Sequence, residues 1–342
     1  MQSLVVGGTG FLGSAIVDAL AAQGRGIAVL SRGGTARDLP EGVEIIRADR
    51  HGDLNALAGR SFDGVFDTCA YAPDAVHGLL NALGGNLDRY VLISSISVYG
   101  RYDEPELTEA QEAADASPED LARAAAVPPE DRAVATAYGP SYGPLKRACE
   151  RAAEDRLGDR ATALRIGQIV GAGDYTDRLT WWVRRFDEAG QQQGRTLPAP
   201  APPDRPVQLL DVRDAAAFAV RCAEGGLGGV WNVAGEPMPM RHLFEAIRAA
   251  AGSAAEVRWM PPAAFAAAGA APWTDVPLMA PDLPVFRHFQ EVSAGRARAA
   301  GLTTRPLSDT LGPLVAWDRG RRDVPLTCGM TPEQEERVLA HR

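Results

Sequence analysis

The sequence predicts an α/β protein, a doubly wound parallel sheet with a smaller C-terminal lobe. Short apolar runs of strand length alternate with segments of helical spacing over the first half of the chain. This alternation is typical of parallel strands joined by crossover helices. The run Tyr90–Ile93 is continuously apolar, as expected of a strand buried on both faces. The length, 342 residues, suits two domains or one large domain with an added lobe.

The chain is expected to begin with a strand, a glycine-rich turn and a helix. The strand is Ser3–Val6, the turn is Gly7–Gly13, and helical spacing covers Ser14–Gln23, with Gly24 ending the helix. Further strands are predicted at Ile27–Leu30, Val43–Ala48, Gly64–Thr68, Tyr90–Ser94, Ala161–Leu164, Val207–Leu210 and Gly229–Ala234. Helical spacing is also present in Ala75–Leu83 and Leu145–Leu157.

Two segments break the alternation. Residues 101–135 hold ten acidic residues and three arginines, so most of the formal net charge of −9 is local. We expect a solvent-facing acidic insertion there. The proline-rich run Leu197–Pro203 is expected to be extended. The predicted domains are therefore a first domain at 1–170, to which 205–235 returns, and a smaller lobe formed by 171–204 and 236–342.

Composition excludes several classes of function. A net charge of −9 with no basic stripe argues against nucleic acid as a partner. The sequence lacks both an apolar run long enough to span a membrane and the pattern of a signal peptide, so we expect a cytoplasmic protein away from membranes. The four cysteines and five histidines are scattered, which predicts neither disulfides nor a metal site. A small-molecule substrate remains the expected partner.

The glycine-rich turn has the spacing G-x-x-G-x-x-G between a strand and a helix. Such a turn lets a pyrophosphate approach backbone N–H groups at the positive end of the helix. Gly7 permits the tight turn, Gly10 permits the close approach, and Gly13 lets the helix pack on its strand. The sequence therefore predicts a Rossmann-type dinucleotide site. The turn residues expected to contact the cofactor are Gly7, Thr9, Gly10, Phe11, Leu12 and Gly13.

The end of the second strand indicates which dinucleotide binds. An acidic residue there would hold the ribose hydroxyls of NAD, and an arginine would suit the 2′-phosphate of NADP. The sequence has Arg32 in Ser31–Gly34, with no acidic neighbour, which favours NADP(H) and leaves NAD(H) as the alternative. Asp49 ends the third strand and could accept a hydrogen bond from adenine. Arg50, the next residue, is also expected to contact the cofactor.

Tyr142 and Lys146 are four residues apart, which places them on one face of a helix. Because Pro144 is tolerated only in a first turn, Tyr142 should begin that helix. A phenol is a poor proton shuttle at neutral pH, and a nearby ammonium would lower its pKa. The segment Ser94–Gly100 adds hydroxyl groups at the carboxyl end of a buried strand, the edge where open α/β sheets bind ligands.

These motifs together make the chain resemble an extended short-chain dehydrogenase/reductase of the NAD-dependent epimerase/dehydratase family. The matching segments, in family order over about residues 1–235, are Gly7–Gly13, Ser94–Gly100, Tyr142 with Lys146, Leu164–Gly167, Val170–Gly171, Asp211–Asp214 and Trp231–Val233. The resemblance implies that Tyr142 is the catalytic acid/base, that Lys146 holds the nicotinamide ribose and tunes Tyr142, and that Ser95 binds the reacting oxygen. It also implies that Cys69 and Ala70 lie beside the ribose, and that the protein is a homodimer.

Departures from the family pattern narrow the expected reaction. Dehydratases of the family carry an Asp-Glu pair after the catalytic hydroxyl residue, where this chain has Ile96 and Ser97. Dehydration is therefore disfavoured. Arg32 favours an NADPH-dependent reductase of a carbonyl substrate, which exchanges its cofactor. The alternatives are a nucleotide-sugar 4-epimerase with tightly bound NAD and a non-catalytic dinucleotide-binding regulator.

Candidates for substrate contact lie beyond the first domain as well as inside it. Trp181 and Trp182 could stack on a ring, and Arg185 could bind an anionic group. Ser97, two residues after Ser95, is the fourth candidate. The sequence does not identify the substrate itself.

Overall fold

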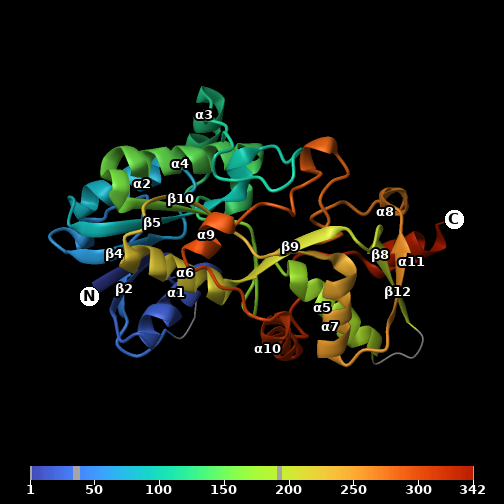
Figure 1. The fold of residues 1–342 in the computed structure, drawn as a ribbon. Helices are drawn as coiled ribbons and strands as arrows, with labels where there is room; N and C mark the ends of the chain where they lie inside the picture. The colour runs from blue at the N-terminus through green and yellow to red at the C-terminus, as the bar shows by residue number, and fades with distance from the viewer. Residues whose placement is uncertain (1, 34–38, 191–194, 342) are drawn as a thin grey trace.

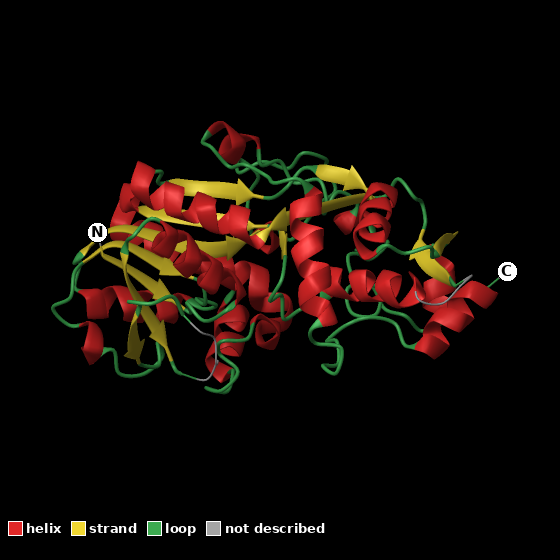
Figure 2. Ribbon diagram, turned by 90° about the horizontal axis from the view of Figure 1, so that it is seen from below, coloured by secondary structure: helices red, strands yellow, loops and turns green. Residues whose placement is uncertain are grey.

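The computed structural model describes residues 2–33, 39–190 and 195–341, which form two lobes lying side by side (Figures 1 and 2). The strands are β1 (Gln2–Val6), β2 (Gly26–Ser31), β3 (Glu44–Arg47), β4 (Phe62–Asp67), β5 (Leu87–Ser95), β6 (Ala161–Ile166), β7 (Gln168–Val170), β8 (Thr196–Pro200), β9 (Pro206–Asp211), β10 (Gly229–Val233), β11 (Pro237–Pro239) and β12 (Glu256–Met260). The α-helices are α1 (Phe11–Ala22), α2 (Pro73–Leu83), α3 (Pro118–Ala126), α4 (Tyr142–Leu157), α5 (Arg178–Gly190), α6 (Val212–Gly225), α7 (Met240–Ala251), α8 (Pro262–Ala267), α9 (Gly295–Ala299), α10 (Leu307–Arg319) and α11 (Pro332–Ala340). Short 3₁₀ helices are η1 (Asn55–Leu57), η2 (Ile96–Tyr99), η3 (Ala135–Ser141), η4 (Gly158–Arg160) and η5 (Pro284–Phe286).

The first lobe is built on a seven-stranded sheet in the order β10-β6-β5-β4-β1-β2-β3. Every neighbouring pair in this sheet is parallel. The strand order reverses direction beside β1, so β1 and β4 lie at the switch point where ligands bind in open α/β sheets. The predicted doubly wound fold is confirmed.

Helices cover both faces of this sheet (Figure 1). On one face α1 and α6 pack over apolar side chains such as Val5, Val29 and Leu164. On the other face α2 and α4 cover a second apolar cluster that includes Leu4, Leu30 and Leu92. Burial on both faces explains why these strands read as continuous apolar runs rather than as alternating ones.

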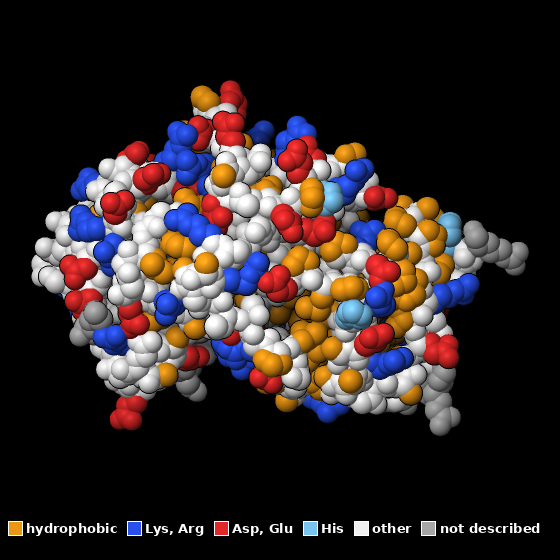
Figure 3. Space-filling model, in the orientation of Figure 1, with side chains coloured by type: hydrophobic (Ala, Val, Ile, Leu, Met, Phe, Trp, Pro, Cys, Tyr) orange, Lys and Arg blue, Asp and Glu red, His pale blue; other side chains and the backbone are white. Residues whose placement is uncertain are grey.

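The second lobe has its own apolar core, around α5, α7 and α10. Two small sheets belong to this half of the chain, a three-stranded one in the order β11-β9-β7 and the pair β12-β8. The first part of the proline-rich run, Leu197–Pro200, lies in strand β8, and the last three residues of the run follow the strand. Strand β8 is at the edge of a two-stranded sheet, where missing N–H donors are tolerated. Figure 3 shows charges of both signs over one face, with hydrophobic side chains gathered over α5 and α7.

Several predicted boundaries differ from the structure. Helix α1 begins at Phe11 rather than Ser14, because the chain turns within Gly7–Gly10 and Gly10 already caps the helix. The predicted return of 205–235 to the first lobe also differs in part, since β9 pairs with β7 and β11 and not with the main sheet. The return starts at α6, which packs on α1, and β10 then completes the sheet.

The acidic insertion is more integrated than a solvated excursion. Tyr102 and Leu107 are buried with Tyr99 and Val292 in a cluster of their own. The backbone N–H of Tyr102 donates to Val285, and that of Ser293 donates to Leu107. The insertion therefore anchors a segment of the C-terminal third of the chain, while α3 projects from the first lobe (Figure 1). Within the described residues no helix is long and apolar enough to cross a membrane.

Candidate active site

The glycine-rich turn joins β1 to α1 at the carboxyl edge of the sheet. Gly7 adopts a φ of +80°, and a Cβ on Gly13 would lie only 2.1 Å from the carbonyl oxygen of Gly7. Helix α1 thus packs against its strand at a distance that only glycine permits. Gly10 caps α1 with no side chain on the first N–H groups. The residues present therefore fit the pyrophosphate of a dinucleotide.

The other residues of the turn surround this N-terminus. Leu12 is buried in the core beneath α1, and Thr9 and Phe11 are half-buried. The Phe11 ring lies within 4 Å of where Cβ atoms on Gly171 and Gly173 would stand. The loop after β7 therefore reaches the glycine-rich turn.

The end of β2 presents Arg32 in an exposed position. The Ser31 hydroxyl accepts a hydrogen bond from the Gly33 N–H at 3.1 Å, and Gly34 lies outside the described residues. In the next loop the Asp49 carboxylate accepts from the His51 N–H at 3.0 Å. Arg32 and Asp49 thus lie at the same edge of the sheet as the glycine-rich turn.

Arg50 corrects the sequence-based expectation, because its side chain points into the protein. It forms a buried ion pair with Asp67 at the end of β4, and Nη2 also donates to the Ala75 carbonyl at 2.8 Å. The Tyr90 hydroxyl donates to the same carboxylate at 2.7 Å. These partners engage both terminal nitrogens of Arg50 inside the protein, so only its backbone remains for the predicted cofactor contact. Sequence reasoning missed Asp67, which looked like an ordinary strand residue.

Cys69 and Ala70 follow Asp67 in the loop after β4. The Cys69 sulfur lies 3.5 Å from Nη1 of Arg50, and burial raises the pKa of its thiol. The Ala70 carbonyl accepts a hydrogen bond of 2.6 Å from the Lys146 ammonium. This loop therefore connects the predicted ribose contacts to the predicted catalytic lysine.

The structure brings Ser95 and Tyr142 together. Ser95 ends β5, and its hydroxyl accepts from the Ser97 N–H and donates to the Ser97 hydroxyl, both at 3.1 Å. Helix α4 starts at Tyr142, as Pro144 predicted. A Cβ on Gly143 would lie 2.2 Å from the Ser97 carbonyl oxygen, so the first turn of α4 rests directly on η2. Burial raises the pKa of Tyr142 to about 12, and a hydrogen bond with Ser95 opposes that rise.

Lys146 lies one turn into α4 and is only 1% exposed. Its ammonium donates to the carbonyl oxygens of Ala70 and Ile93, at 2.6 and 2.5 Å, and lies 5.4 Å from the centre of the Tyr71 ring. Burial lowers its pKa. The ammonium is thus fixed between the ends of β4 and β5, beside the tyrosine pair Tyr71 and Tyr142, whose ring centres are 6.1 Å apart.

A buried carboxylate, Glu150, fastens the elements that carry these side chains. It accepts from the Ser94 hydroxyl at 2.6 Å, from Arg165 of β6 at 2.8 and 3.0 Å, and from Arg147 at 3.0 Å. Arg165 lies over the Tyr99 ring at 4.8 Å. This network explains why Ser94 is unavailable for chemistry while its neighbour Ser95 faces Tyr142. The chain offered no sequence signal for Glu150.

The loop between β7 and α5 carries a further tyrosine, Tyr175. It is 65% exposed, and negative charge on it would raise the pKa of Tyr71 and of Tyr142. The loop is held by Asp177, which has a φ of +55° and binds Arg321 and the Thr327 N–H at 2.7 and 3.0 Å. Sequence reasoning missed Tyr175, because nothing nearby in the sequence marks it.

The predicted substrate contacts divide into two groups. Ser97 lies beside Ser95, as expected, whereas Trp181 and Trp182 are buried in the core of the second lobe. The Trp182 indole donates to the Pro277 carbonyl at 2.9 Å. Arg185 is paired with Glu335 and Glu188. We therefore correct the expectation for both tryptophans and Arg185, whose side chains already have partners inside the protein.

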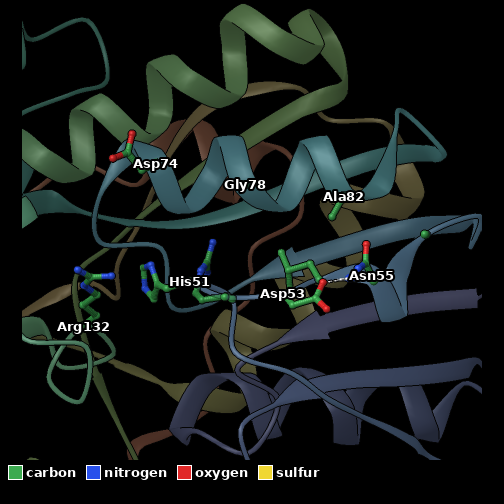
Figure 4. Close-up of a pocket in the computed structure, with 11 residues that line it drawn as sticks. His51, Asp53, Asn55, Asp74, Gly78, Ala82 and Arg132 are labelled. Carbon is green, nitrogen blue, oxygen red and sulfur yellow. Dashed lines mark hydrogen bonds between the residues drawn. The ribbon is translucent and has the colours of Figure 1, made fainter.

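A separate cavity of about 420 Å³ lies between α2 and the segment 51–58 (Figure 4). His51 and Arg132 line one end of it below Asp74, and Asn55 lies toward the other end. It contains neither Ser95 nor Tyr142. In the described part of the chain, no group of three or more histidine, cysteine or acidic side chains could hold a metal ion.

Comparison with known sequences agrees with this arrangement. Residues 3–234 match the model of the NAD-dependent epimerase/dehydratase family. A 2′-dehydrokanamycin reductase of Streptomyces kanamyceticus is 36% identical over 114 residues, which is 32% of this chain and 32% of that protein. The similarity thus spans about a third of the relative's length.

Solved structures resemble the whole chain at low sequence identity. One is a UDP-N-acetylglucosamine 4-epimerase from Methanobrevibacter ruminantium in complex with UDP-N-acetylmuramic acid, with a TM-score of 0.66 and 20% identity over 94% of this chain and 98% of that one. Another is an enzyme of Bordetella bronchiseptica in complex with NAD⁺, with a TM-score of 0.64 and 18% identity over 94% of this chain and 99% of that one. At such identities the likeness establishes the fold.

Proposed function

This chain belongs to the NAD-dependent epimerase/dehydratase family, and on that premise we propose that it is an NADPH-dependent reductase of a carbonyl compound. The observation that supports the proposal is that Tyr142 lies beside Ser95 at the carboxyl edge of the sheet, near a glycine-rich turn that fits a dinucleotide. Lys146, one turn further along the same helix, is fixed by the carbonyl oxygens that follow β4 and end β5. Arg32 and the similarity to a reductase support reduction as the direction of chemistry. We also propose a cytoplasmic homodimer, as the family resemblance implies.

Tyr142, Ser95 and Lys146 have different roles in the proposed reduction. The cofactor, when bound, supplies a hydride to the carbonyl carbon. Tyr142 donates a proton to the carbonyl oxygen, and the Ser95 hydroxyl hydrogen-bonds that oxygen while negative charge develops on it. A protonated Tyr142, favoured by its raised pKa, is the form that reduction requires. Lys146 holds the ribose edge of the site through its fixed ammonium.

The first experiment is a cofactor analysis of the purified protein. It is denatured and its supernatant examined for nucleotide, and the intact protein is then titrated with NADPH and NADH. We expect little released nucleotide, tighter binding of NADPH than NADH, and a loss of that preference in Arg32→Glu. NADPH oxidation with 2′-dehydrokanamycin, the carbonyl compound named for the relative, is the first activity assay, followed by other ketones and aldehydes.

A nucleotide-sugar 4-epimerase is the second candidate, because oxidation and re-reduction of one carbon would use the same Ser95, Tyr142 and Lys146. Stoichiometric NAD released on denaturation would overturn the exchangeable-reductase proposal and favour epimerisation. If Tyr142→Phe leaves every measured activity of the protein unchanged, both enzymes are excluded in favour of a dinucleotide-binding regulator.

A further inference from the structure

Arg47, at the end of β3, lies directly beside the predicted ribose-binding edge. In the main sheet Arg47 pairs with Ser31, the last residue of β2, so the two strands end side by side. Ile46 is buried and Arg47 is exposed, as expected where successive side chains of a strand point to opposite faces. A Cβ on Gly33 would lie 2.8 Å from Nη1 of Arg47. The guanidinium of Arg47 therefore extends over the turn that carries Arg32.

Arg47 and Arg32 differ from most arginines of this lobe, which already have partners. Arg50 is paired with Asp67, and Arg60 with Glu44 at the opposite end of β3. Within residues 2–33, 39–190 and 195–341, neither Arg32 nor Arg47 forms an ion pair with a carboxylate. Two exposed guanidinium groups at the ends of adjacent strands create a local excess of positive charge on a protein whose net charge is −9.

His51, in the loop after β3, lies near further arginines. The pKa of His51 is lowered by burial first and then by the positive charges of Arg50, Arg132 and Arg32, against the opposing effect of Asp49. Asp49 itself is engaged with the His51 N–H. Because Arg32 and Arg47 are both exposed at adjacent strand ends, the ends of β2 and β3 are suited to a dianion rather than to a pair of neutral ribose hydroxyls.

We infer that Arg47 is a specificity-determining residue for the cofactor, the second arm of a clamp whose first arm is Arg32 and whose ligand is the 2′-phosphate of NADP(H). This inference rests on the proposed function. A phosphate ester carries close to two negative charges at neutral pH, and a guanidinium can bind two of its oxygens at once. The pyrophosphate is assigned to the turn after β1, so the next strand ends along the sheet are left for the adenosine ribose.

The test measures the contribution of the 2′-phosphate to binding without that of the nicotinamide, because the probes are adenosine nucleotides. Binding of adenosine 2′,5′-bisphosphate and of adenosine 5′-monophosphate is measured by calorimetry for the full-length protein and for Arg47→Ala, Arg32→Ala and Arg60→Ala. Arg60 is the matched control, an arginine just before β4 that is paired with Glu44 at the far end of β3. Circular dichroism and thermal melting verify that each variant is folded.

We expect Arg47→Ala to weaken the binding of adenosine 2′,5′-bisphosphate by about tenfold or more, which is the effect of losing one charge-assisted hydrogen bond. The affinity for adenosine 5′-monophosphate should change little. Arg32→Ala should have the same effect on both affinities, and Arg60→Ala should change neither affinity. Arg47→Lys should recover part of the loss, because the charge returns without the planar fork. The preference of the wild-type protein for the bisphosphate over the monophosphate should also decrease as salt is added, because the guanidinium groups of Arg32 and Arg47 are both exposed.

Two results would overturn the inference, and they differ from each other. If wild-type protein prefers the bisphosphate and Arg32→Ala loses that preference while Arg47→Ala keeps it, Arg47 is not part of the clamp and the proposed reductase stands. If wild-type protein binds both nucleotides equally, no 2′-phosphate clamp exists, and the NADPH preference of the proposed function fails with it.

Discussion

Helices α4 and α5 each carry side chains that the sequence marked as functional candidates, and the two sets lie in different surroundings. In α4, Tyr142 faces Ser95 at the edge of the sheet, and Lys146 is fixed on backbone carbonyls beneath it. In α5, Trp181 and Trp182 fill the core of the second lobe, and the following arginines are paired with carboxylates. Tyr142 therefore remains a candidate for chemistry because it lies at the sheet edge beside Ser95, whereas the tryptophans of α5 belong to the core of the second lobe.

The reason for the difference lies in what each helix packs against. The N-terminus of α4 meets η2 at a distance that only a glycine at position 143 permits, which places Tyr142, the first residue of the helix, beside Ser95. Helix α5 lies between α7 and α10, so most of its surface is interior. Arg184 of α5 is held by Asp318 of α10, with Nη2 at 2.7 Å from the carboxylate.

The largest expected effect is on α4. Tyr142→Phe should reduce turnover by roughly 10²- to 10⁴-fold, the usual contribution of a positioned acid or base, because phenylalanine cannot donate the proton. Cofactor affinity and melting temperature should change little. Steady-state kinetics and NADPH titration check both points. A Tyr142→Phe variant that turns over at the wild-type rate would contradict proton transfer through this residue.

A substitution in α5 should affect the stability of the protein rather than its chemistry. Trp182→Ala removes a fully buried indole and should lower the free energy of unfolding by about 3–5 kcal/mol. Chemical denaturation with a fluorescence or circular dichroism probe measures the change. If the variant is instead as stable as wild type but loses substrate affinity, the side chain acts in binding after all, and the contrast between the helices fails.

The ion pair between Arg184 of α5 and Asp318 of α10 gives a second test of the structural role of α5. Asp318→Ala leaves Arg184 buried without its carboxylate, which should cost about 3 kcal/mol of unfolding free energy. The double variant Arg184→Met with Asp318→Leu should recover most of that loss, because neither charge is then buried alone. Equal stability of the single and double variants in urea denaturation would contradict this account.

The smallest effect concerns the proton of Tyr142. Burial raises its pKa to about 12, whereas an unfolded chain ionises near the ordinary value of about 10. The folded state thus keeps this proton to higher pH, and its contribution to stability is intact below about pH 10 and decreases from there to about pH 12. Comparing the alkaline phenolate spectra of wild type and Tyr142→Phe at pH 10 checks this. A half-ionised Tyr142 at that pH would contradict it.

Much of the fold followed from local sequence signals. The alternation of apolar runs with helical spacing predicted the parallel sheet, and Gly7–Gly13 predicted the turn between β1 and α1. Pro144 predicted the start of α4, because proline is tolerated only in a first helical turn. These signals succeed because turn geometry and burial act on neighbouring residues.

Contacts across the chain could not be predicted in this way. Only the folded structure pairs Arg50 with Asp67, buries Trp182 under Pro277, and gathers Ser94 and Arg165 around Glu150. The roles of Ser95, Tyr142 and Lys146 in chemistry stay predictions, although the structure brings the first two together and fixes the third nearby.

The sequence by itself carried the motifs at the turns and strand ends that indicate the family and predict a dinucleotide cofactor. The tertiary structure decided which of those side chains remain available. Arg32 and Arg47 are exposed at adjacent strand ends, while Arg50 and Arg185 are already paired inside the protein. The physical reason is that a charge buried during folding must find a partner, and that partner comes from a distant part of the chain.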